Sequence, residues 1–307
     1  MKRSPAAAAL GLAAACLGAP AASGIWTLPP GVPPPPVTDT SALTPARIEL
    51  GRRLFYDPRL SVNGNSACGA CHRQEFAFTD GRARAAGATG DLHARGSMSL
   101  VNVAYRSALT RATPPIGSLE EQALVPMFSE HPVELGLKGH EARVFAALAV
   151  DPMYARLFRE AFPSHEPRVT SKTIAAAIAA FERTIVSFRS PYDRYRFEGV
   201  ASAIEPSARR GAALFEGKAG CARCHEGINF DGSANGSRAP TLRNIGVTSP
   251  YMLDGRAPTL DAVLDGHGAG AALDSSERGD LLAFLDSLTD LDALVDTRWR
   301  DPWRTQW

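Results

Sequence analysis

The stretches Cys68-Gly-Ala-Cys71-His72 and Cys221-Ala-Arg-Cys224-His225 repeat one motif within a chain of 307 residues. Two thiols three positions apart can each form a thioether with a vinyl group of haem, and the histidine that follows can then bind the iron. A structural zinc site or a pair of redox dithiols is the alternative, but the motif occurs twice among only five cysteines, downstream of an export signal. We therefore interpret the two motifs as attachment sites for two covalently bound haem c groups.

The N-terminus has the pattern of a secretory leader. A charged start, a short apolar run and a series of small residues make residues 1–23 a predicted signal peptide. Ala19-Pro20-Ala21 offers an ordinary cleavage site, whereas Cys16 offers an alternative as the acylated first residue of a lipoprotein. Covalent haem attachment takes place outside the bacterial cytoplasm, so we expect a periplasmic protein, with a lipid anchor if Cys16 is acylated.

The charge balance excludes one class of partner. The formal net charge is +1, and it becomes about −1 when Lys2 and Arg3 leave with the signal peptide. The chain has no basic patch of the kind that binds nucleic acid, so no nucleic-acid partner is expected.

A helix followed by a haem motif occurs twice along the chain. Gly51-Arg-Arg-Leu54-Phe55 precedes the first motif, and Gly211-Ala-Ala-Leu214-Phe215 precedes the second. This internal repeat predicts a mainly α fold of two cytochrome c-like haem domains in tandem. We place them at residues 44–195 and 196–307, after a proline-rich N-terminal arm at residues 24–43.

Two further helices and a tail complete the organisation. Apolar residues at helical spacing predict one core helix over 168–188 and another over 275–288. The tail from Trp299 to Trp307 carries three of the four tryptophans. We expect it to pack on its own, second domain, and the alternative is a patch that docks a partner.

Several short stretches resemble the bacterial di-haem cytochrome c peroxidase and MauG family over nearly the whole mature chain. Within that family, the segments around Ser97-Met98-Ser99 and Pro126-Met127-Phe128 are most similar to the methanobactin-associated MbnH branch, whose members oxidise a tryptophan on a partner protein. The stretches that carry the family resemblance are Leu50-Gly-Arg-Arg-Leu-Phe55, Leu119-Glu-Glu-Gln-Ala123, Pro132-Val-Glu-Leu-Gly136, Phe181-Glu-Arg-Thr184 and Pro240-Thr-Leu-Arg-Asn244.

The resemblance implies that the two haems have different roles. The first is the site where hydrogen peroxide reacts, with His72 as proximal ligand, and the second is six-coordinate and handles electrons. Glu134 and Gln122 match the carboxylate and amide of the distal pocket, and Pro126 matches its proline. This agrees with the chemistry, because cleavage of peroxide at iron needs a group that moves a proton from the near to the far oxygen.

The resemblance also implies a sixth ligand for the second iron. Its position falls on His267, which would give bis-histidine coordination with His225. Met252 is the less favoured candidate, and a third interpretation is that His267 only caps a glycine-rich turn. Two nitrogen ligands would lower the reduction potential relative to a histidine and a methionine.

A calcium ion between the haems is a further implication of the resemblance. The backbone carbonyls of Thr248 and Pro250 match two of its ligands, and carbonyl oxygens suit this cation. The asparagine that completes the set in the family falls near Gly96 in this chain.

The chain departs from the family pattern at two places. Arg111 stands where the family has a tryptophan between the haems. Electron sharing would then need another relay, such as Tyr105, or direct tunnelling between the haem edges. The segment between His225 and Pro240 is also shorter than in relatives. We interpret His93, which follows the first motif, as a loop histidine with satisfied hydrogen bonds.

The sequence therefore predicts an exported di-haem peroxidase-like oxidoreductase that uses hydrogen peroxide and oxidises a partner protein or accepts electrons from one. The alternatives are a di-haem electron-transfer cytochrome without catalysis and a sensor whose open haem binds a small ligand.

Overall fold

The computed structural model describes residues 24–37, 39–106, 109, 116–232 and 239–304. Across these ranges the chain is helical, and β structure is limited to isolated bridges between single pairs of residues. In chain order the helices are α1 (Pro45–Tyr56), α2 (Cys68–Cys71), α3 (Leu119–Phe128), α4 (Glu141–Val150), α5 (Pro152–Ala161), α6 (Ser171–Glu182), α7 (Pro191–Phe197), α8 (Pro206–Glu216), α9 (Leu260–Gly266) and α10 (Ser275–Asp286).

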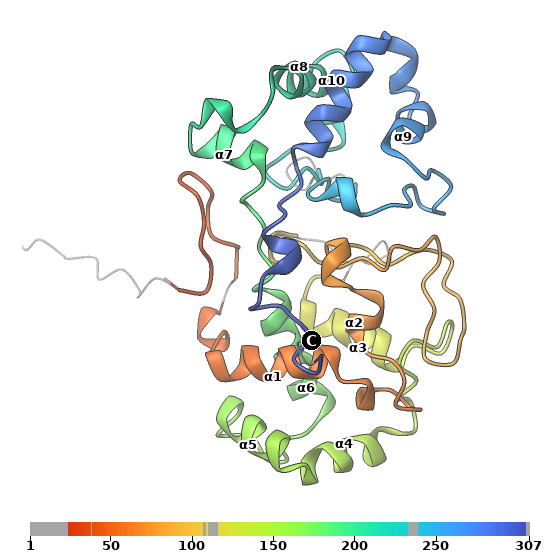
Figure 1. Ribbon diagram of the computed structural model, residues 1–307. Helices are drawn as coiled ribbons and strands as arrows, with labels where there is room; N and C mark the ends of the chain where they lie inside the picture. Colours follow the sequence, from red (N-terminus) through yellow and green to blue (C-terminus); the bar gives the residue numbers. More distant parts are fainter. Residues whose placement is uncertain (1–23, 38, 107–108, 110–115, 233–238, 305–307) are drawn as a thin grey trace, which may run out of the picture.

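The helices form two stacked units (Figure 1), with α1 to α6 in the first and α7 to α10 in the second. Each unit contains one haem motif and its own cluster of buried apolar side chains. The predicted mainly α fold with two units in tandem is therefore confirmed. No helix within the described ranges is long and apolar enough to cross a membrane.

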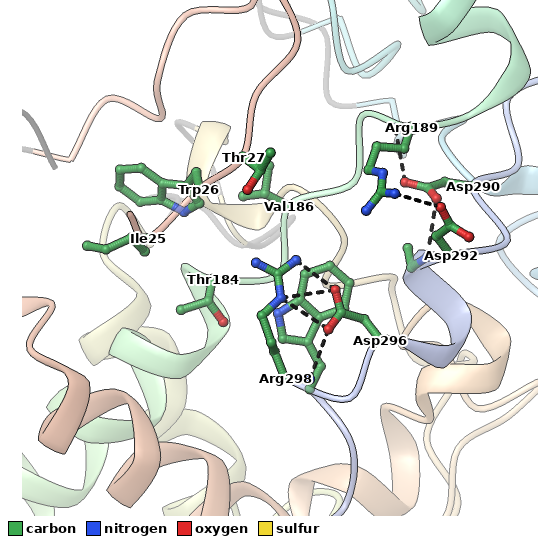
Figure 2. A pocket seen from close by; sticks show the side chains of 12 residues that line it. Ile25, Trp26, Thr27, Thr184, Val186, Arg189, Asp290, Asp292, Asp296 and Arg298 are labelled. Atoms are coloured by element: carbon green, nitrogen blue, oxygen red, sulfur yellow. Dashed lines mark hydrogen bonds and ion pairs between the residues drawn. The ribbon is translucent and has the colours of Figure 1, made fainter. Parts of the chain in front are cut away.

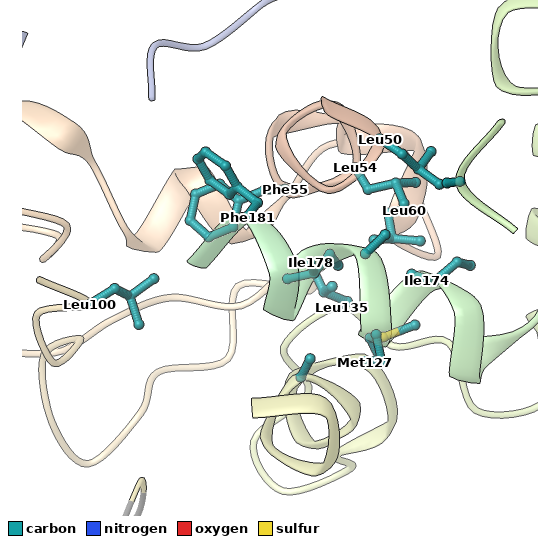
Figure 3. Packing of buried hydrophobic residues seen from close by; sticks show 14 of the residues in the cluster. Leu50, Leu54, Phe55, Leu60, Leu100, Met127, Leu135, Ile174, Ile178 and Phe181 are labelled. Carbon is teal, nitrogen blue, oxygen red and sulfur yellow. The ribbon is translucent and has the colours of Figure 1, made fainter. Parts of the chain in front are cut away.

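The first unit is built on a close crossing of α1 and α6. A Cβ atom on Gly51 would lie 1.8 Å from the carbonyl oxygen of Ala177, so only glycine allows the two helices to approach this far. Beside the crossing, the rings of Phe55 and Phe181 pack edge to face with centroids 5.2 Å apart. Figure 3 shows the surrounding cluster, in which Leu50, Leu54, Leu60, Met127, Leu135, Ile174 and Ile178 are all buried.

The second unit repeats this construction with α8 and α10. A Cβ atom on Gly211 would lie 1.9 Å from the carbonyl oxygen of Asp280. The rings of Phe215 and Phe284 lie 5.1 Å apart, in the place of the pair found in the first unit. The Gly-x-x-Leu-Phe repeat of the sequence thus encodes the same helix crossing twice.

Two asparagines hold the chain where it passes between the units. Asn102 accepts a hydrogen bond from the amide of Ser187 at 2.7 Å and donates one to its carbonyl at 3.0 Å. Asn244 accepts one from the amide of Asp290 at 2.8 Å. The Ser187 hydroxyl in turn donates to the Asp290 carboxylate at 2.9 Å, so the two connecting stretches are joined to each other.

The C-terminal tail packs on the first unit. Trp299 is 2% exposed and packs edge to face on Phe78, and its carbonyl accepts a hydrogen bond of 2.8 Å from the Tyr56 hydroxyl. Trp303 donates from its indole nitrogen to the carbonyl of Arg53 at 3.2 Å. This corrects the prediction that the tail packs on its own domain: the chain returns to the first unit after α10, so the expected range 196–307 does not follow the packing at its end.

The N-terminal arm lies against the junction of the units. The indole nitrogen of Trp26 donates to the carbonyl of Arg183 at 2.7 Å, and Val32 is buried. A small cavity of about 20 Å³ lies between the arm, the first connecting stretch and the tail, where Asp296 and Arg298 form an ion pair (Figure 2). The arm is therefore packed on the body of the protein, although its sequence suggests a segment outside any core.

The helix crossings generate a stability prediction. Gly211→Ala should lower the free energy of unfolding by about 1–3 kcal/mol, because the new methyl group would overlap a backbone carbonyl that cannot move away. Gly279→Ala in α10 is the matched control, since nothing lies within 4 Å of its Cβ position, and it should raise stability by about 0.5–1 kcal/mol. Thermal unfolding followed by circular dichroism measures both, and equal effects of the two substitutions would contradict the proposed constraint.

Candidate haem attachment and peroxide site

The first haem motif forms the short helix α2, and His72 ends it. The Nδ1 atom of His72 lies 2.8 Å from the carbonyl oxygen of Phe78, which has a positive φ of 60°. When Nδ1 donates this hydrogen bond, Nε2 is left free to bind a metal. Burial lowers the pKa of His72, so the imidazole is held in the neutral form that acts as a ligand.

The second motif is arranged in the same way. The Nδ1 atom of His225 lies 3.0 Å from the carbonyl oxygen of Phe230, another phenylalanine with a positive φ, here 50°. Burial again lowers the pKa of the histidine. Both histidines are thus oriented by a backbone carbonyl five or six residues downstream, with the same nitrogen free.

Three of the four motif cysteines fit thioether attachment better than redox chemistry. Burial raises the pKa of Cys68, Cys71 and Cys221 above that of an ordinary thiol, whereas reactive dithiols have a lowered pKa. Within the described ranges, no group of three or more His, Cys, Asp or Glu side chains is placed to hold a metal ion, which does not support a zinc site. The thiols and the oriented imidazoles therefore fit haem at both motifs.

The three residues assigned to the distal pocket lie on α3 and on the segment after it. Gln122 and Pro126 are four positions apart on α3, so they share one face of the helix. The carbonyl of Pro126 accepts a hydrogen bond of 2.9 Å from the amide of Leu135, which holds the neighbouring Glu134 beside that end of α3. All three side chains are half-buried.

Glu134 is electrostatically linked to the first attachment site. Its carboxylate contributes to the raised pKa of both Cys68 and Cys71, so it lies near these thiols. Burial raises the pKa of Glu134 itself. A carboxyl group with a raised pKa at the edge of a haem site can both accept and return a proton.

His93 is the neighbour of Glu134 that sequence reasoning missed. Its Nε2 atom lies 4.0 Å from the Glu134 carboxylate, and a protonated imidazole there opposes the rise in the pKa of Glu134. The only indication of this pairing in the sequence is a histidine that follows the first motif. What it faces depends on how the loop that carries it folds onto a segment some forty residues later.

The second attachment site has two candidate ligands close together. His267 ends α9, is exposed, and its Nδ1 atom lies 3.0 Å from the carbonyl oxygen of Val263. Its charge contributes to the lowered pKa of His225, so the two imidazoles are near each other. Met252 is adjacent, because its Cε atom would lie 3.5 Å from a Cβ atom on Gly266. The hydrogen bond between His267 Nδ1 and Val263 is compatible with two roles for His267. It could be an iron ligand that binds through Nε2, or a residue that only caps α9.

The candidate calcium carbonyls belong to a loop that meets the first unit. A Cβ atom on Gly255 would lie 2.5 Å from the Cβ atom of Ala83 and 3.3 Å from the ring of Pro250. Three positions before Ala83, the buried Oδ2 atom of Asp80 has no hydrogen-bond partner in the described part of the chain. A buried carboxylate oxygen of this kind fits a nearby cation, although Gly96 offers no side-chain ligand.

A second buried acid lies near the first attachment site. Glu182 at the end of α6 is buried, its Oε2 atom has no hydrogen-bond partner among the described residues, and burial raises its pKa to about 8. Its charge contributes to the raised pKa of Cys68. In the sequence Glu182 stands only as part of the Phe-Glu-Arg-Thr stretch. The neighbouring Arg183 does not pair with it but forms an ion pair of 2.6 Å with Glu120.

Arg111 and Cys16, two residues singled out in the sequence, lie outside the described residues.

Comparison with protein families matches residues 45–201 to the family described as di-haem cytochrome c peroxidase. The chain is 34% identical to the methylamine utilization protein MauG of Methylorubrum extorquens, over 85% of this chain and 82% of that protein. It is 32% identical to a cytochrome c peroxidase of Denitromonas iodatirespirans, over 94% and 93% of the two chains.

Solved structures agree with these relatives. The crystal structure of a MauG-like protein associated with microbial copper homeostasis superimposes with a TM-score of 0.84, at 34% sequence identity, over 91% of this chain and 99% of that one. A di-haem peroxidase of Burkholderia thailandensis shares the fold with a TM-score of 0.64 at 20% identity, over 89% of this chain and 96% of that one.

Proposed function

Because this chain belongs to the di-haem cytochrome c peroxidase and MauG family, we propose that it is an exported oxidoreductase that uses hydrogen peroxide to oxidise a partner protein. The observation that carries the proposal is Glu134, a half-buried carboxylate with a raised pKa beside the cysteines of the first motif. When bound, the two haems supply the iron that takes peroxide and a second centre that holds electrons. The residues of the first site would take part in the reaction with peroxide, and those of the second site would hold the centre that handles electrons.

Glu134 is the proton carrier of the first site. Heterolysis of the peroxide O–O bond requires that the proton on the near oxygen reaches the far oxygen, which leaves as water. A carboxylate can take the first proton and return it, and the raised pKa of Glu134 brings its two protonation states closer in free energy near neutral pH. Gln122 binds and orients the peroxide through its amide, and Pro126 limits the access of water from the same helix face.

The second site differs from the first because a further imidazole lies near its proximal histidine. His225 and His267 would together hold the second iron, and two protein ligands there would close it to peroxide. Met252 is the second candidate for the same position. A site closed on both sides suits electron transfer and not binding of a substrate.

The proposed substrate is a residue on a partner protein, and the runner-up is a small cytochrome that donates electrons. Relatives named MauG and the MauG-like protein linked to copper homeostasis favour the first choice. We also propose export to the periplasm through residues 1–23, with Cys16 as the residue that would carry a lipid anchor. A calcium ion held by the carbonyls of Thr248 and Pro250 completes the proposal.

Replacement of Glu134 tests the proposed chemistry. Glu134→Gln should slow the reaction of the haem-loaded protein with hydrogen peroxide by about 100-fold or more, because the amide cannot carry the proton. Stopped-flow absorbance of the ferric protein measures this rate. Glu130→Gln, four residues earlier and exposed beside Lys138, is the control and should leave the rate unchanged. An unchanged rate in Glu134→Gln would favour a plain electron-transfer cytochrome or a sensor.

Electron paramagnetic resonance tests the ligands of the second iron. The ferric protein should give one high-spin and one low-spin signal, and His267→Ala should convert the low-spin signal to high spin. Met252→Leu should leave the low-spin signal in place. If the two variants behave in the opposite way, Met252 is the ligand and His267 caps the turn. His165→Ala is the control, since this exposed side chain packs on Phe162 in the first unit.

A further inference from the structure

The loop around residues 84–95 is attached to the segment that carries Glu134. Ala86 and Leu92 form an antiparallel bridge across the loop, and the amide of Ala88 donates to the carbonyl of Glu134 at 2.7 Å. At Gly87 the backbones touch, because a Cβ atom there would lie 1.8 Å from the carbonyl oxygen of Val133. The loop therefore has a fixed position against Glu134.

The backbone of His93 is fixed on this loop by hydrogen bonds to both its amide and its carbonyl group. Its amide donates to the carbonyl of Ala85 at 2.9 Å, and the Arg84 side chain donates to its carbonyl at 2.6 Å. The imidazole is then directed at Glu134, with Nε2 and Oε2 separated by 4.0 Å. The exposed fractions of the two side chains are 22% and 31%, so water screens the pair only in part.

The same loop contacts the first haem motif. The Cys71 sulfur lies 3.6 Å from the carbonyl oxygen of Ala86. One end of the loop thus reaches the attachment site, while the other presents a histidine to the carboxylate assigned to proton transfer. A loop histidine with only local hydrogen bonds would not need this arrangement.

We propose that His93 is a positioning residue whose imidazole, held on the loop, pairs with the Glu134 carboxylate beside the first attachment site. The inference rests on the proposed role of Glu134. In this arrangement His93 does not bind iron, because its Nε2 atom faces the carboxylate. The pair makes Glu134 a proton acceptor at lower pH than burial alone would allow.

The direction of the effect follows from the charges around Glu134. Burial raises the pKa of Glu134, and a protonated His93 lowers it. Loss of His93 should therefore move the pKa of Glu134 upward. The adjoining segments carry other titratable or charged side chains. These are Arg84, Asp91 and Arg95 on the loop, Glu130, His131 and Lys138 on the segment itself, and Cys68 and Cys71 on α2, the last two being thioethers in the haem-loaded protein.

The test titrates Glu134 directly in the haem-loaded protein. Infrared spectra recorded across pH should contain a carboxyl C=O band that Glu134→Gln removes. In His93→Gln the midpoint of this band should rise by about half a pH unit to one unit, and in His93→Arg, which restores a cation, it should return to or below the native value. The acid limb of the peroxide reaction should move with the midpoint. His165→Gln is the control and should leave both unchanged.

Two outcomes would overturn the inference. One is a midpoint in His93→Gln equal to that of the native protein, and the other is conversion of a low-spin ferric signal to high spin in this variant, which would make His93 an iron ligand. If Glu134→Gln itself leaves the peroxide reaction unchanged, the proposed function fails. If Glu134→Gln slows the reaction while His93→Gln leaves the midpoint unmoved, only the role of His93 fails.

Discussion

The hydrogen bond between the imidazole of each haem motif and a backbone carbonyl is the constraint on which the geometry of both motifs depends. His72 and His225 are each oriented by the carbonyl of a phenylalanine with positive φ, Phe78 and Phe230. Such a bond fixes which nitrogen is available and the direction in which it points. Phe78 is itself held by the ring of Trp299 from the tail, so the far end of the chain supports the position of the first histidine.

The two units start from one construction and differ in what surrounds it. A glycine crossing and a close phenylalanine pair hold the helices beside each motif, at Gly51 in the first unit and Gly211 in the second. The first unit adds α3 and the loop at 84–95, which bring a carboxylate and a histidine to its attachment site. The second unit instead brings the imidazole of His267 toward His225. In the proposed function, the difference between a reactive site and an electron-handling site would thus arise from segments added to a shared scaffold.

The sequence was sufficient for those parts of the structure that are encoded locally. The haem motifs, the helix that starts after Thr44 and the repeated Gly-x-x-Leu-Phe could be predicted because each depends on spacing within one or two turns. Trp299 and His93 could not, because their partners, Phe78 and Glu134, are far away in sequence. Long-range packing of a tail or a loop leaves no periodic pattern, so the sequence placed the tail on the wrong unit and left His93 as an ordinary loop residue.

In the proposed function, the connection between the units affects electron transfer between the two sites, because the rate of tunnelling depends steeply on distance. Ile185 belongs to the first cluster and Tyr192 to the second, and the chain returns between Leu288 and Ala293. Both connecting stretches are bonded to buried asparagines, and Ser187 joins them through Asp290. Breaking any of these bonds would leave a buried polar group without a partner, at a cost of about 1–3 kcal/mol each. The network therefore opposes relative motion of the units and keeps the two attachment sites at a constant separation.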